Sequence, residues 1–181
     1  MKVLMAAVLG VLAALIGCTA IDSAPETASG TSAEWDSYVQ SIENAYQDNA
    51  ENLQRIVSLL QGQEIYKVSR GGKDGLRVQA TETSSPEEAP QWLQQKLYPL
   101  FQSLSLHSVK VAGQRLQVAP AGGGPSYKDH SMFMTFDYFS DTRPAEICSA
   151  NTIDSTPEGG HCRWPLPGSG WYAHFIWAGS D

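Results

Sequence analysis

AEWDSYVQSIENAYQDNAENLQRIVSLLQ, residues 33–61, contains neither proline nor glycine, and the other elements can be placed around its helical pattern. Thr31 and Glu34 have the spacing of a capping box, in which two side chains satisfy free backbone N–H groups at a helix start. Gly62 stands where a helix commonly ends. We therefore predict one long helix over residues 33–61.

The apolar side chains of this helix recur in steps of four and three residues. They are Trp35, Val39, Ile42, Tyr46, Leu53, Ile56 and Leu60. Asn49 fills the one polar place in this stripe. In a coiled coil, a single polar residue at such a place sets the register, and a coiled coil through this helix would join copies of the chain in a homo-oligomer. Other apolar residues, among them Tyr38 and Val57, widen the stripe toward that of a helix on a sheet. We therefore favour packing on a sheet and keep homo-oligomerisation through this helix as the alternative.

Short segments of alternating polarity after the helix predict two β-hairpins. Their strands are residues 64–70, 76–82, 108–112 and 115–119. Between the hairpins lies a second helical stretch whose apolar face consists of Leu93, Leu97, Leu100 and Leu104. Its start is either Ser85–Pro86 or a point near Pro90, and Pro99 must kink or shorten it.

The C-terminal third is rich in aromatic residues and contains two further alternating segments, residues 132–139 and 171–177. The complete pattern predicts an α+β fold. We expect an antiparallel sheet of about six strands, with the long N-terminal helix and a second, shorter helix packed on one face. Residues 33–181 would form a single domain, as the length of 181 residues suggests.

The first residues predict where the protein resides. Lys2 precedes an apolar run that is shorter than the roughly 20 residues needed to span a bilayer, and small residues follow it, as in a signal peptide. Leu15-Ile16-Gly17-Cys18 resembles the lipobox of bacterial lipoproteins. The resemblance implies a signal peptide over residues 1–17, an acylated Cys18 and a flexible tether over residues 18–32. Because Thr19 and not aspartate follows Cys18, it also implies a periplasm-facing position on the outer membrane.

The other two of the 3 cysteines, Cys148 and Cys162, form an even pair in an oxidising compartment. We predict one disulfide between them. The competing interpretation is a metal site that uses both cysteines with His161 and His174. Adjacent His-Cys is not a zinc-site spacing, and no Cys-x-x-Cys is present. We therefore expect no metal and no cofactor.

Motifs for catalysis are weak in this chain. Asp137 and Asp141 could face the same side of an extended strand, as the two carboxylates of a glycoside hydrolase would. Lys128-Asp129-His130 is a second weak constellation, and it is more typical of a solvated loop. The formal net charge of -7 argues against nucleic acid or anionic lipid as a ligand. We therefore predict a protein that is not an enzyme.

The partner-binding candidates are aromatic residues of the C-terminal third, above all Trp164 and Tyr172, because aromatic side chains dominate interface energies. Together these patterns predict a lipid-anchored envelope lipoprotein that acts as a non-catalytic binding or assembly component with a protein partner in the periplasm. An immunity or inhibitor lipoprotein that neutralises a secreted envelope toxin is the first alternative. An envelope hydrolase is the second.

Overall fold

The computed structural model describes residues 32–72, 75–122, 127, 131–141, 143–145, 147–148, 152–153, 155, 158–168 and 170–178. The predicted signal peptide, Cys18 and all but the last residue of the predicted tether lie outside these ranges. The described helices are α1 (Ser32–Gln47), α2 (Ala50–Leu60) and α3 (Gln91–Ser103). Among the described residues, no helix has both the length and the apolar character that crossing a membrane requires.

One antiparallel sheet of eight strands forms the other layer, in the order β3-β2-β1-β4-β5-β6-β8-β7. Its strands are β1 (Lys67–Gly71), β2 (Gly75–Gln79), β3 (Glu87–Glu88), β4 (Leu106–Ala112), β5 (Arg115–Pro120), β6 (Ser131–Phe139), β7 (Gly159–Pro165) and β8 (Trp171–Ala178). The two predicted hairpins are β1–β2 and β4–β5. The predicted α+β class and antiparallel sheet are therefore confirmed.

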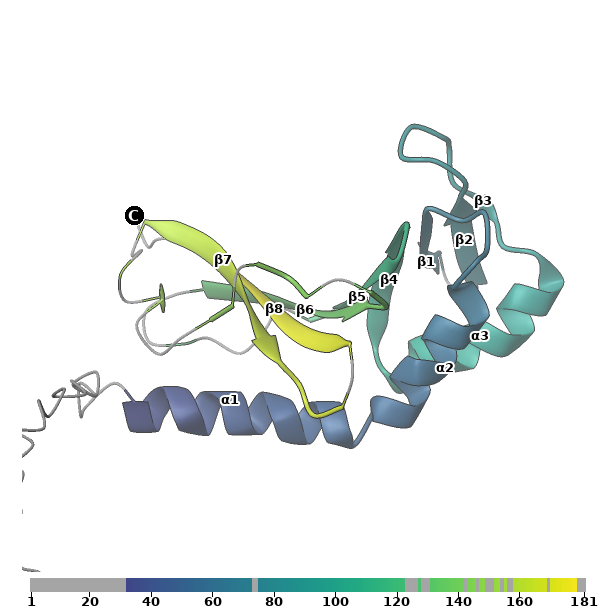
Figure 1. The fold of residues 1–181 in the computed structure, drawn as a ribbon. Helices are drawn as coiled ribbons and strands as arrows, with labels where there is room; N and C mark the ends of the chain where they lie inside the picture. The colour runs from purple at the N-terminus through teal and green to yellow at the C-terminus, as the bar shows by residue number, and fades with distance from the viewer. Residues whose placement is uncertain are drawn as a thin grey trace, which may run out of the picture.

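The prediction of one continuous helix over residues 33–61 was wrong, because the chain breaks it at Asp48 and Asn49. The Asn49 N–H donates to the Tyr46 carbonyl, three residues back, at 3.0 Å. The Asn49 side chain donates to the Ala45 carbonyl at 2.8 Å. A short polar side chain that bonds the local backbone in this way competes with regular helix. Figure 1 shows the result, in which α2 turns away from the axis of α1.

The apolar stripe of both helices packs on the sheet, as expected for the favoured interpretation. All seven of its residues are buried. The ring of Trp35 lies 5.8 Å from that of Phe175 on β8, and the ring of Tyr46 lies 6.1 Å from that of Phe136 on β6. The predicted coiled-coil seam is thus occupied within the molecule. Homo-oligomerisation remains a prediction, and it would have to use the exposed side of α1.

The sheet has two more strands than the six predicted. Glu87 and Glu88 form the short edge strand β3 and do not begin a helix. The second strand missed is β7, whose glycines and terminal proline are typical of loops. At Gly160 the backbone passes the Trp177 indole so closely that an added Cβ would lie 2.8 Å from the ring. Glycine at this point reflects close packing between β7 and β8.

Two finer predictions are confirmed. The second helix starts at Gln91 with Pro90 at its N-cap, so the later of the two expected starts holds. Cys148 and Cys162 form a disulfide whose Cα atoms are 5.0 Å apart. The Cys148 N–H also donates to the Arg163 carbonyl at 2.8 Å. The disulfide and this hydrogen bond fasten the segment around Cys148 to the outer edge of β7.

Candidate functional site

The described helices lie on one face of the sheet, and none of them lies on the other face (Figure 1). On β6, Met132 and Met134 are buried on the helix side, and alternate residues such as Phe133 point to the opposite side. We call this opposite side the open face. Cross-strand pairing places Arg115 beside Phe139, and Gln117 and Tyr172 beside Asp137, all on the open face.

A buried carboxylate forms the centre of the open face. The Asp137 side chain has an exposed fraction of 0%. Its Oδ2 accepts hydrogen bonds from Arg115 Nη2 at 2.6 Å and from Arg163 Nε at 3.1 Å. Its Oδ1 accepts from the Thr135 hydroxyl at 3.0 Å. Both carboxylate oxygens are therefore occupied, and the charge-assisted bonds join β5, β6 and β7.

His174 on β8 completes this polar cluster. Its Nδ1 lies 3.4 Å from Asp137 Oδ2 and 3.4 Å from Gln117 Nε2, while Nε2 is buried without a hydrogen-bond partner. Burial lowers the pKa of His174 from 6.5 to about 4, Asp137 opposes this shift, and Arg163 and Arg115 reinforce it. His174 is therefore neutral at neutral pH. The guanidinium groups of Arg115 and Arg163 then share the carboxylate of Asp137.

An aromatic ring covers the two arginines. The Phe139 ring centroid lies 5.4 Å from the Arg115 guanidinium carbon and 5.7 Å from that of Arg163. Tyr172 meets Phe139 edge to face at 5.6 Å. The Arg115 side chain still has an exposed fraction of 33%. The centre of the open face is thus a rigid polar and aromatic surface with one accessible cation.

This arrangement is unsuited to the hydrolase chemistry considered from the sequence. The strand β6 ends at Phe139, so its alternation does not continue to Asp141, which is exposed in the following turn. Asp137 is sequestered by two arginines. The pair of free carboxylates that hydrolysis needs is therefore not assembled here. Lys128, Asp129 and His130 lie outside the described residues.

Beside the polar cluster the open face carries an exposed apolar pair. Phe133 and Ile176 face each other directly across β6 and β8, with exposed fractions of 44% and 38%. His161 on β7 lies next to Ile176 in register. Apart from Trp92, these are the only large apolar side chains found exposed among the described residues. Alternation along residues 131–139 places Phe133 opposite the core residues, and that signal could have identified it from the sequence.

The two aromatic residues proposed from the sequence lie on different faces. Tyr172 is half-buried on the open face. Trp164 faces the helices, where its Nε1 donates to Glu43 Oε1 at 3.0 Å and its ring lies 6.1 Å from that of Trp35. Trp164 therefore packs against α1, and the two residues do not form one surface. Within the described ranges, no His, Cys, Asp and Glu side chains group closely enough to hold a metal ion.

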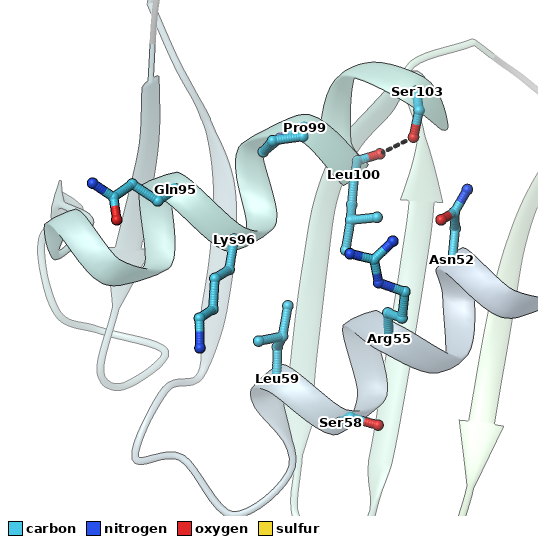
Figure 2. Close-up of a pocket in the computed structure, with 9 residues that line it drawn as sticks. All are labelled: Asn52, Arg55, Ser58, Leu59, Gln95, Lys96, Pro99, Leu100 and Ser103. Carbon is cyan, nitrogen blue, oxygen red and sulfur yellow. Dashed lines mark hydrogen bonds between the residues drawn. The ribbon is translucent and has the colours of Figure 1, made fainter.

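A second feature is a groove of about 650 Å³ between α2 and α3 (Figure 2). Arg55 enters it from α2 and Lys96 from α3, and Leu59 and Leu100 lie between the two helices. This volume is in the range of small-molecule sites. The groove is not apparent from the sequence, because its walls come from two helices that are separated along the chain by a whole hairpin.

Comparison with protein-family models, with curated proteins and with solved structures finds no match for this chain.

Proposed function

We propose that this protein is a lipid-anchored, non-catalytic binding or assembly component of the bacterial envelope, which holds a protein partner on its open face. One observation carries the proposal: Phe133 and Ile176 form an exposed apolar pair on the face of the sheet opposite the helices. Exposed large apolar side chains that are neighbours in space are typical of interaction sites.

The surroundings of this pair support a protein partner. The hydrogen bonds of Asp137 and Gln117 connect β5, β6, β7 and β8, which keeps the surface rigid before binding and lowers the entropic cost of association. Tyr172 and Arg115 are residue types enriched at protein interfaces. The predicted acylation of Cys18 would place this surface at a membrane. A rigid, exposed surface that combines apolar with polar and charged side chains is expected of a binding protein.

The test is a quantitative pull-down with the full chain carrying Cys18→Ser, from periplasmic and secreted fractions of the source organism. The variant Phe133→Asp/Ile176→Asp should lose the proteins that the parent chain recovers in stoichiometric amounts. Trp92→Ser is the matched control, because Trp92 is equally exposed but lies on α3. If Trp92→Ser also fails to recover these proteins, or if the double variant still recovers them, binding through the open face would be contradicted.

The same experiment separates the alternatives. A secreted toxin as the recovered partner would favour the immunity or inhibitor function, and a deletion strain should then be sensitive only to a competing strain. A component of the organism's own envelope would favour assembly, and the deletion should then disturb the envelope in monoculture. Asp137→Asn is unsuited to testing a hydrolase, since it would disrupt the cluster that stabilises the sheet.

A further inference from the structure

The groove between α2 and α3 has no part in the proposed docking surface, because it lies in the helix layer and the open face lies on the other side of the sheet. Arg55 and Lys96, its two charged lining residues, come from different helices (Figure 2). No carboxylate lines the groove. Among the described residues, neither cation has an ion-pair partner within 4.0 Å. In a chain with a net charge of -7, this is a local positive site.

The same groove has an apolar part. Leu59 and Leu100 lie in the gap, and Pro99 adds a further apolar wall. Trp92 precedes Lys96 by four residues, so helical spacing places both on the same side of α3, and the indole has an exposed fraction of 42%. The exposed indole therefore lies about one helical turn from the groove, outside the residues that line it.

We propose that the groove binds a small amphiphilic carboxylate. Its carboxylate would contact Arg55 and Lys96, for which guanidinium and ammonium groups are the natural partners. Its apolar body would lie against Leu59 and Leu100. The side-chain amides of Asn52 and Gln95 line the same groove and can donate further hydrogen bonds. A cationic or a purely apolar ligand would leave the two charges without a partner.

The test uses octanoate as the probe, with 1-octanol and acetate as probes that lack either the charge or the apolar body. The protein is the full chain carrying Cys18→Ser with its disulfide intact. Calorimetry should detect octanoate binding that is stronger than that of either other probe. Backbone amide shifts in NMR spectra should change along α2 and α3. Shift changes confined to Phe133 and Ile176, or no binding of octanoate, would overturn the proposal.

Matched variants identify the groups responsible. Arg55→Gln/Lys96→Gln should weaken octanoate binding by more than about tenfold, because the loss of one charge-assisted hydrogen bond alone corresponds to about that factor, and should leave 1-octanol binding unchanged. Lys67→Gln/Arg77→Gln removes two positive charges from the open face and should change the binding of neither octanoate nor 1-octanol. Ser58→Trp should block both probes by filling the groove. Equal octanoate binding in the parent chain and in the first double variant would refute the assignment, and the NMR spectra show whether each variant is folded.

Discussion

Asp137 is the residue on which the polar centre of the open face depends. A fully buried carboxylate with two arginines is stable only while each charge has its partner. We expect Asp137→Asn to lower the free energy of unfolding by about 3 kcal/mol, because removing one partner of a buried ion pair leaves the other charges of the cluster poorly compensated. Urea denaturation followed by tryptophan fluorescence measures this loss. The exposed Asp141→Asn serves as the control, and equal stability of both variants would contradict the role of the cluster.

His174 makes the stability of the same cluster depend on pH. Its pKa is about 4 in the folded protein and 6.5 ordinarily, so between these values the unfolded chain binds a proton that the folded chain does not. The folded protein therefore has its full stability with respect to His174 above pH 6.5, and it loses stability as the pH falls toward 4. The expected loss is about 3 kcal/mol.

Denaturation midpoints measured between pH 7 and pH 4 test this expectation, with His174→Gln as the comparison. The variant should show a shallower dependence on pH, because glutamine does not titrate. The groups that face His174 are Asp137, Arg115, Arg163 and His161, and they are the same in both proteins. Parallel curves for the parent chain and the variant would show that His174 is not responsible.

At the scale of elements, the disulfide holds an edge of the sheet. The strand β7 has one strand neighbour, β8, and on its other side Cys148 and Ile147 are attached by the disulfide, one hydrogen bond and one bridge. Closing a loop of about 15 residues stabilises a fold by roughly 3 kcal/mol. We expect Cys148→Ser/Cys162→Ser to lose about that much.

Hydrogen exchange locates the effect of this variant. The amides of β7 should exchange faster than those of β4 and β5, which lie in the interior of the sheet. Reduction of the parent protein should reproduce the change. Unchanged protection of β7 in the double serine variant would mean that its pairing with β8 is sufficient by itself.

At the scale of the whole molecule, the fold gathers charges that are scattered in the sequence. Lys67, Arg77, Lys110, Arg115 and Arg163 all lie on the open face. Three carboxylates offset part of this charge: Glu82 lies 3.8 Å from Lys110, Glu88 lies opposite Arg77 in register, and Asp137 binds Arg115 and Arg163. Among these residues the cations still outnumber the carboxylates, which the acidic composition of the chain did not indicate. A partner with acidic groups near its contact surface would complement this face.

The predicted anchor also belongs to this scale, since it would determine where that face is presented. We expect the protein extracted from membranes to begin at Cys18 and to carry the mass of its acyl chains. The variant Cys18→Ser should lack that mass and retain residues 1–17. Intact-mass spectrometry measures both, and Cys148→Ser/Cys162→Ser, which keeps Cys18, is the control. Acyl mass on the Cys18→Ser protein would refute the lipobox assignment.

Much of the local structure could be predicted from residue spacing. The buried stripe of α1 and α2, the two hairpins, the later start of α3 and the disulfide all follow from neighbours close in the sequence or from a simple count of cysteines. The break at Asn49 was missed because its flanks keep the same apolar period. The strand β7 was missed because glycine and proline obscure its alternation.

The sequence by itself determined which side chains are apolar, at what period they recur and hence the two-layer α+β class. Only the tertiary structure decided that Arg115, Asp137, Arg163 and His174 meet, since sheet register brings to Asp137 three residues that lie 22, 26 and 37 positions away in the sequence. It also placed Arg55 and Lys96 in one groove. Periodicity reports which face of an element is buried, whereas such sites depend on how whole elements pair and pack, and that is a property of the complete fold.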